Sequence, residues 1–129
     1  LFRSVMAAWE KILTIKEDTE EILSSLTAEN YNLYILSNFH QKAFEYVSSK
    51  YEFFNYFDGR VISADIGLIK PDFEIYDHLL DKFKLKAEET IFIDDSRENI
   101  KAALKKGLRV IHFTDAESLK EELKLYLRE

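Results

Sequence analysis

The sequence predicts a three-layer α/β/α domain whose central sheet is mostly parallel. Short apolar runs alternate along the chain with longer stretches of helical periodicity. Such alternation implies right-handed strand–helix–strand crossovers, which place parallel strands in one sheet. The 129 residues, 47% of them hydrophobic, are enough for one domain with a buried core.

The N-terminal half begins with two expected helices. Apolar residues recur at helical spacing over residues 2–14, which predicts an amphipathic helix. A second helix is expected over 17–28, because acidic residues crowd its start. Asn30 then turns the chain into the apolar run 33–36, which predicts a buried strand ending at Ser37-Asn38.

The middle of the chain is expected to add a helix and a second strand. Residues 40–49 have helical character, and the aromatic-rich stretch 51–57 is expected to pack a loop or short helix onto the core. Residues 60–62 predict a short strand, after which Pro71 marks a helix start that continues to about Lys84.

The C-terminal part gives the clearest pattern. Residues 90–93 predict a third strand, which runs into Asp94-Asp95-Ser96. A helix follows and ends at Gly107, a residue that suits the C-terminal cap. Residues 108–113 predict a fourth strand, and 115–127 a closing helix.

Composition narrows the classes of function. A net charge of −6 with interleaved Lys and Glu gives no positive field, so neither nucleic acid nor a membrane surface is an expected partner. The absence of cysteine excludes disulfides and thiolate metal sites, and it is compatible with a cytoplasmic location. No apolar run approaches the roughly 20 residues that span a bilayer.

The acid pair Asp94-Asp95 points to a hard cation. Adjacent carboxylates at the end of an apolar strand repel each other and lose hydration, so they need a cationic partner. Oxygen ligands of this kind suit Mg²⁺. The alternative is that one aspartate caps the following helix while the other is solvated.

Ser37 and Lys70 lie at comparable positions, where ligands bind in such sheets. Ser37 at a strand end can donate to a phosphoryl oxygen, although turn chemistry alone explains a serine there. Lys70, just before Pro71, can neutralise a phosphoryl group. The alternative for Lys70 is an ordinary surface lysine.

Together three segments resemble the haloacid dehalogenase-like (HAD) hydrolase superfamily of phosphatase type. They are 33–38, 63–72 and 91–102, and they are similar to that family's second, third and fourth motifs in order. The resemblance implies a Rossmann-like core over 17–129, with 1–16 as the remnant of a helical cap. It also implies that Ser37 and Asn38 bind the phosphoryl group of a small phosphorylated metabolite.

The same resemblance assigns the remaining roles. Lys70 would stabilise the nucleophile and the transferring phosphoryl group. Asp95 would coordinate Mg²⁺ directly, while Asp94 would coordinate it or orient a ligating water. Asn99 would support this loop from the next helical turn. His40 is expected on a surface helix start, and His112 is expected to be structural.

The family's first motif, a strand ending in Asp-x-Asp that carries the nucleophile, is not found in this sequence. Its strand lies at the centre of the family's sheet, so we expect a central strand to be missing. The sheet would then close by direct pairing, borrow a strand from another copy through its exposed edges, or stay incomplete. A chain opening on Leu1 leads us to expect a C-terminal fragment, inactive alone.

Three hypotheses follow for function. The first is a Mg²⁺-dependent phosphatase in which this segment lacks the nucleophile. The second is a non-catalytic phosphoacceptor or regulatory domain, because receiver domains also combine an acidic pair with Lys-Pro. The third is a degenerate member kept as a binding module.

Overall fold

The computed structural model describes residues 4–7, 16–37, 56–62, 70 and 72–127. Within them five strands form one sheet: β1 (Ser4–Ala7), β2 (Asn32–Ser37), β3 (Gly59–Ile62), β4 (Thr90–Asp94) and β5 (Arg109–His112). Their order is β3-β2-β1-β4-β5, and every pairing is parallel. The predicted parallel α/β architecture is confirmed.

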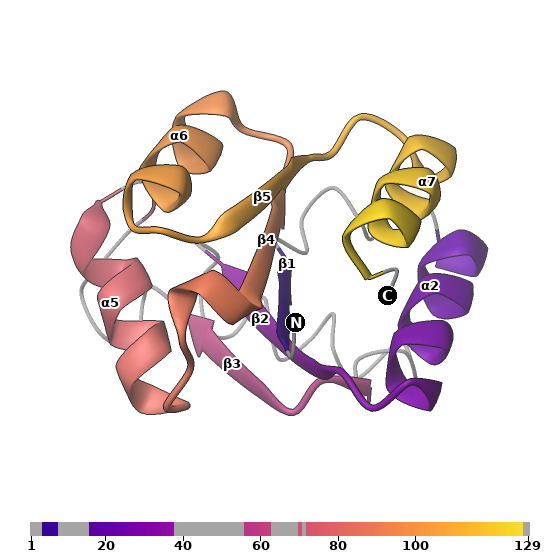
Figure 1. The fold of residues 1–129 in the computed structure, drawn as a ribbon, viewed down its shortest axis with the longest axis horizontal. Helices are drawn as coiled ribbons and strands as arrows, with labels where there is room; N and C mark the ends of the chain where they lie inside the picture. Colours follow the sequence, from indigo (N-terminus) through magenta and orange to yellow (C-terminus); the bar gives the residue numbers. More distant parts are fainter. Residues whose placement is uncertain (1–3, 8–15, 38–55, 63–69, 71, 128–129) are drawn as a thin grey trace.

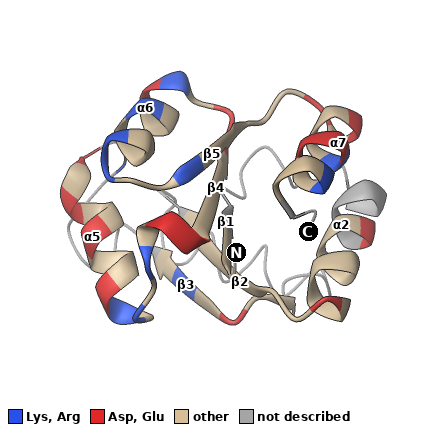
Figure 2. Ribbon diagram, in the orientation of Figure 1, with Lys and Arg blue, Asp and Glu red and all other residues tan. Residues whose placement is uncertain are grey.

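Four described helices cover the two faces of this sheet. Helices α5 (Phe73–Lys82) and α6 (Arg97–Lys105) lie on one side, and α2 (Lys16–Ala28) and α7 (Ala116–Leu127) lie on the other (Figure 1). A short 3-10 helix, η3 (Ala87–Glu89), leads into β4. Acidic and basic segments are mixed over α5 and α7 (Figure 2). No described helix is long and apolar enough to cross a bilayer.

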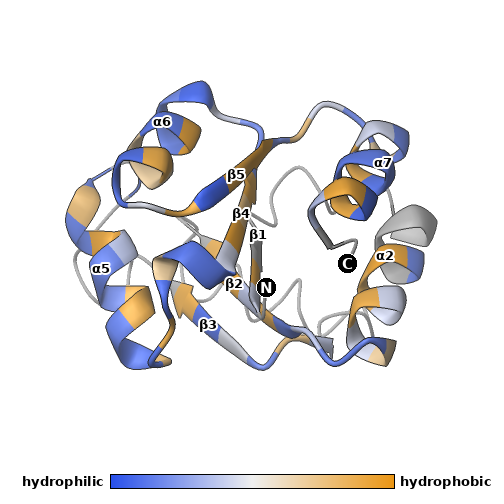
Figure 3. Ribbon diagram, in the orientation of Figure 1, coloured by the Kyte–Doolittle hydropathy of each residue, from blue (hydrophilic) through white to orange (hydrophobic). Residues whose placement is uncertain are grey.

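Two apolar clusters hold the three layers together, one on each face of the sheet. Successive residues of β4 alternate between them, with Ile91 and Ile93 in the cluster under α2 and α7, and Phe92 in the cluster under α5 and α6. This alternation is the ordinary geometry of a strand buried on both sides. Figure 3 shows the result, with a hydrophobic middle part of β4 and hydrophilic segments on the outer helices.

Helices α2 and α6 end close to the expected residues, Asn30 and Gly107. Gly107 follows α6 with φ +91°, and its N–H and that of Leu108 donate to the carbonyls of Leu104 and Ala103. Asn30 follows α2 in the same way, with φ +67°. Both are Schellman caps, in which a residue of positive φ stops the helix and starts the turn into the next strand.

The central strand is the main correction to the sequence expectations. Residues 4–7, expected within an amphipathic helix, form β1 and pair with β2 on one side and β4 on the other. Ser4 and Val5 are each only 2% exposed. The slot between β2 and β4 presents backbone donors and acceptors on both sides, and filling it satisfies groups that a helix would leave unpaired.

This correction changes three expectations. The central position is occupied, so the sheet neither lacks its middle strand nor closes by direct pairing of β2 with β4. Ser4–Ala7 belong to the core sheet and not to a cap remnant. The third alternative was a strand borrowed from another copy at the edges of β2 and β4, and β1 pairs with both of these edges.

Candidate functional site

The carboxyl ends of β2 and β4 meet at one edge of the sheet. Because β1 pairs Ala7 with both Ile35 and Ile93, the residues two places further along, Ser37 and Asp95, lie at the same level. Two strand spacings separate them, which is about 10 Å across the sheet. Ligands of parallel sheets bind at this edge.

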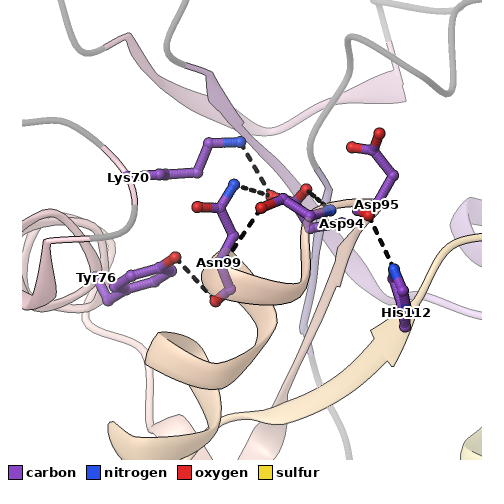
Figure 4. Close-up of polar contacts among 7 residues, drawn as sticks. Lys70, Tyr76, Asp94, Asp95, Asn99 and His112 are labelled. Atoms are coloured by element: carbon purple, nitrogen blue, oxygen red, sulfur yellow. Dashed lines mark hydrogen bonds and ion pairs between the residues drawn. The ribbon is translucent and has the colours of Figure 1, made fainter.

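Asp94 is the most heavily bonded side chain of this edge. It is 2% exposed, and its carboxylate accepts three hydrogen bonds. Lys70 Nζ lies 3.1 Å from Oδ2, Asn99 Nδ2 lies 2.9 Å from the same oxygen, and the Ser96 N–H donates to Oδ1 at 2.9 Å (Figure 4). A buried carboxylate with this many donors is held in one orientation.

Lys70 is buried with Asp94. It is 5% exposed, so the alternative of an ordinary surface lysine is wrong. Taking two charges out of water costs more than an isolated pair returns, and the additional hydrogen bonds to Asp94 offset that cost. The lysine that was expected from a position before Pro71 is therefore fixed at the carboxyl edge of β4.

The turn after Asp94 is organised by Ser96 and Asn99. Ser96 is the N-cap of α6, and its hydroxyl accepts the Asn99 N–H at 3.4 Å. The alternative in which an aspartate caps this helix is therefore corrected, because the cap is Ser96. Only the main-chain N–H of Asn99 takes part in this cap. Its side-chain amide donates to Asp94, which agrees with the expectation that Asn99 supports the loop.

Tyr76 holds the same helical turn from α5. It is fully buried, its hydroxyl donates to the Asn99 carbonyl at 3.1 Å, and its ring meets Phe92 edge to face at 5.4 Å between centroids. Burial, and then the negative charge of Asp94, raise the pKa of Tyr76. The hydroxyl therefore stays protonated and remains a donor. No sequence motif marked Tyr76 as part of the site.

Asp95 differs from its neighbour. It is exposed, and no contact joins its carboxylate to the Lys70–Asp94 pair (Figure 4). Its main-chain carbonyl lies 2.8 Å from His112 Nε2. His112 was expected to be structural, and its contact with a main-chain carbonyl agrees with that expectation. The register of the sheet brings His112 to this turn, because β4 and β5 pair in parallel with Asp94 opposite His112.

Among these side chains, the Asp95 carboxylate is the group that suits direct binding of Mg²⁺. The Asp95 carboxylate accepts no hydrogen bond from the described residues, so both oxygens are open to a hard cation. Direct ligation by Asp94 Oδ2 is disfavoured, because the Lys70 ammonium already lies 3.1 Å away. The described residues contain no group of three acidic, His or Cys side chains that would hold a metal.

Other expected site residues are placed less fully. Ser37 is the last residue of β2, as predicted, and pairs with Ile62 of β3. Asn38, His40 and the expected helix 40–49 lie outside the described residues, as do residues 63–69 of the third segment.

Sequence comparisons point in one direction. A family model described as haloacid dehalogenase-like hydrolase matches residues 1–113. Sesquiterpene phosphatase astK of Aspergillus oryzae is 35% identical over 95 residues, which are 74% of this chain and 48% of that protein. Flavin mononucleotide hydrolase 1 of Arabidopsis thaliana is 27% identical over 81% of this chain and 42% of that protein. The chain spans about half the length of these relatives.

Solved structures agree on the fold. An uncharacterized protein from Corynebacterium glutamicum superposes with a TM-score of 0.85 at 18% identity, over 96% of this chain and 93% of that one. A HAD family enzyme from Bacteroides thetaiotaomicron, in complex with magnesium and inorganic phosphate, gives a TM-score of 0.67 at 27% identity. That match covers 77% of this chain and 54% of the other.

Proposed function

The chain belongs to the family of haloacid dehalogenase-like hydrolases, and we propose that its site serves a Mg²⁺-dependent phosphatase acting on a small phosphorylated metabolite. One observation carries the proposal. Lys70, Asp94 and Asn99 form a buried, hydrogen-bonded unit at the carboxyl edge of the sheet, next to an exposed Asp95. A fixed cation beside an available carboxylate suits a phosphoryl group bound together with a metal.

The relatives support this reading without fixing the substrate. Two of them have names that describe a phosphatase and a mononucleotide hydrolase. The Bacteroides enzyme was crystallised with magnesium and inorganic phosphate. Their substrates differ from each other, so the proposal for this chain stops at a phosphate monoester of a small molecule.

We assign roles on that basis. Asp95 would hold Mg²⁺, which supplies positive charge next to the phosphoryl oxygens. Asp94 keeps the Lys70 ammonium at the sheet edge, where Lys70 attracts a phosphoryl oxygen. Ser37, at the end of β2, would donate to the phosphoryl group together with Asn38. Asn99 and Ser96 keep the Asp94 carboxylate from turning away.

The nucleophile is the part of the site that this segment does not supply. After β1 the sequence reads Ala8-Trp9-Glu10, where the family resemblance calls for Asp-x-Asp. Covalent transfer forms a bond between phosphorus and a carboxylate oxygen while the bond from phosphorus to the ester oxygen breaks, and the motif that would supply this carboxylate is not found in the sequence. We therefore propose that these 129 residues bind Mg²⁺ and phosphate weakly and do not turn substrate over.

The test is hydrolysis of p-nitrophenyl phosphate with and without Mg²⁺. We expect hydrolysis no faster than in buffer alone. Robust Mg²⁺-dependent hydrolysis that is lost in Lys70→Ala would contradict the proposal that this chain is inactive. The coding sequence ahead of residue 1 gives a second test. An apolar strand ending in Asp-x-Asp there supports the phosphatase, and because the slot between β2 and β4 takes one strand, that strand would displace Ser4–Ala7.

A binding or regulatory role is the second candidate. The observation in its favour is β1, which fills the central slot with Ser-Val-Met-Ala and brings no carboxylate to that position. A start codon near residue 1 would favour a binding module. A stable aspartyl-phosphate formed from a small phosphodonor would favour a phosphoacceptor.

A further inference from the structure

We propose that His112 is a positioning residue for Asp95. Its hydrogen bond to the Asp95 main-chain carbonyl keeps the Asp95 carboxylate where it can bind a divalent cation. The inference rests on the proposed function, because it takes Asp95 as the ligand of Mg²⁺. It adds a residue from β5 to a site otherwise built from β2, β4, α6 and Lys70.

The contact has a defined direction. The Asp95 carbonyl oxygen is an acceptor, so His112 Nε2 carries the proton and donates across 2.8 Å (Figure 4). Both the neutral Nε2–H tautomer and the doubly protonated ring provide this donor. His112 is the last residue of β5, where the parallel pairing with β4 sets it opposite Asp94.

This contact completes the anchoring of the turn. On the N-terminal side the Asp94 carbonyl accepts the Phe113 N–H at 2.8 Å. On the C-terminal side the Ser96 N–H donates to Asp94 Oδ1 at 2.9 Å. His112 fixes the carbonyl between these two points, and with it the peptide plane that follows the Asp95 Cα.

Fixing that plane matters because the Asp95 side chain is exposed. An exposed carboxylate that binds a cation loses conformational freedom, and a main chain already held in place reduces that loss. Partners that hydrogen-bond a metal-ligating group directly change metal affinity by about 10- to 100-fold when they are removed. His112 acts through the main chain, so we expect an effect at the lower end of this range.

A small set of variants separates this role from packing. His112→Phe keeps a planar ring and removes the donor, while His112→Gln keeps an N–H donor near the position of Nε2. His78→Phe is the matched control, because His78 is half-buried on α5 and makes no hydrogen bond to the described residues. Asp95→Asn reports on the metal ligand itself.

The first measurement is a Mg²⁺ titration of the 129-residue chain, followed through the NMR amide signals of Asp95 and Ser96. We expect His112→Phe to weaken Mg²⁺ by about tenfold, and His112→Gln and His78→Phe to stay near the unchanged chain. Equal affinity in His112→Phe, with Asp95→Asn still defective, would overturn the inference and leave the proposed function standing.

The second measurement needs no metal. ¹⁵N relaxation of the Asp95 and Ser96 amides should show increased motion in His112→Phe and not in His112→Gln. Unchanged motion would overturn the inference whatever the titration shows. Binding that is unaffected by Asp95→Asn would instead count against Asp95 as the ligand, and so against the proposed function, while the relaxation result decides the role of His112.

Discussion

Lys70 and Asp94, 24 residues apart in the sequence, meet in a buried ion pair with Nζ 3.1 Å from Oδ2. Their side chains are 3% and 1% exposed, so water contributes almost nothing to holding either charge. Asn99 and the Ser96 N–H supply the additional bonds that such a pair requires. The pair ties the segment before α5 to the end of β4, and the candidate site is organised around it.

Removing one member of this pair should destabilise the fold strongly. Lys70→Met leaves the Asp94 charge buried without its cation, and we expect a loss of about 3–5 kcal/mol in the free energy of unfolding. Lys70→Met combined with Asp94→Asn should lose less than the two single changes summed. Urea unfolding of the four proteins measures this coupling, and strict additivity would show that the two charges do not depend on each other.

Tyr76→Phe should loosen the first turn of α6. The change removes the donor to the Asn99 carbonyl, at an expected cost of about 0.5–1.5 kcal/mol. Tyr126→Phe is the matched control, since the Tyr126 hydroxyl donates to the Val110 carbonyl at 3.0 Å, away from the acid pair. Only Tyr76→Phe should shift the NMR signals of the Asn99 side-chain amide, and equal shifts in both variants would contradict its place in the site.

Alkaline pH should expose the raised pKa of Tyr76. Its ordinary value is 10.0, and burial, followed by the charge of Asp94, moves it upward in the folded chain. Above pH 10 the unfolded chain loses this proton while the folded chain keeps it, so the contribution is full below pH 10 and is lost as the pH rises.

The slope attributable to Tyr76 should approach about 1.4 kcal/mol per pH unit. The measurement is the difference in unfolding free energy between the unchanged chain and Tyr76→Phe from pH 9 to 11, a range set around the ordinary tyrosine value. The variant should show the shallower decline. Parallel curves would mean that Tyr76 titrates alike in both states.

Proline at position 5 tests the central strand. Val5 pairs with Leu33 and Ile91 in β1, so Val5→Pro removes a backbone donor inside the sheet. Leaving a buried acceptor unpaired costs about 1–3 kcal/mol. The first turn of the helix expected over residues 2–14 would tolerate the same change. If Val5→Pro is as stable in urea as the unchanged chain, residues 4–7 do not form the central strand.

Local chemistry explains why most elements were predictable. Residues 90–93 form a largely apolar run before the acid pair, and they lie in β4, which extends one residue further to Asp94. Gly107 and Asn30 mark helix ends because few other residues accept positive φ cheaply. Lys70 and Asp94 were expected at the same edge because parallel strands place their carboxyl ends together.

Features that depend on pairing between distant segments were not predictable. Ser4–Ala7 carry a helical pattern, and they form a strand because the sheet offers unpaired backbone on both sides of one slot. His112 and Tyr76 contact main-chain carbonyls of the acid-pair turn, and such contacts leave no pattern in the sequence. Asp94 is buried and paired with Lys70, whereas Asp95 is exposed. Two adjacent aspartates in a sequence do not reveal which of them is buried.

A Mg²⁺ titration of this chain beside Asp95→Asn decides whether the acid-pair edge of the sheet binds a metal together with phosphate. We expect weak, saturable Mg²⁺ binding with the largest NMR shifts at Asp95 and Ser96. We also expect inorganic phosphate to bind more tightly when Mg²⁺ is present. Both effects should vanish in Asp95→Asn. Shifts centred elsewhere, or phosphate binding that ignores both Mg²⁺ and Asp95, would contradict a metal-assisted phosphoryl site at this edge of the sheet.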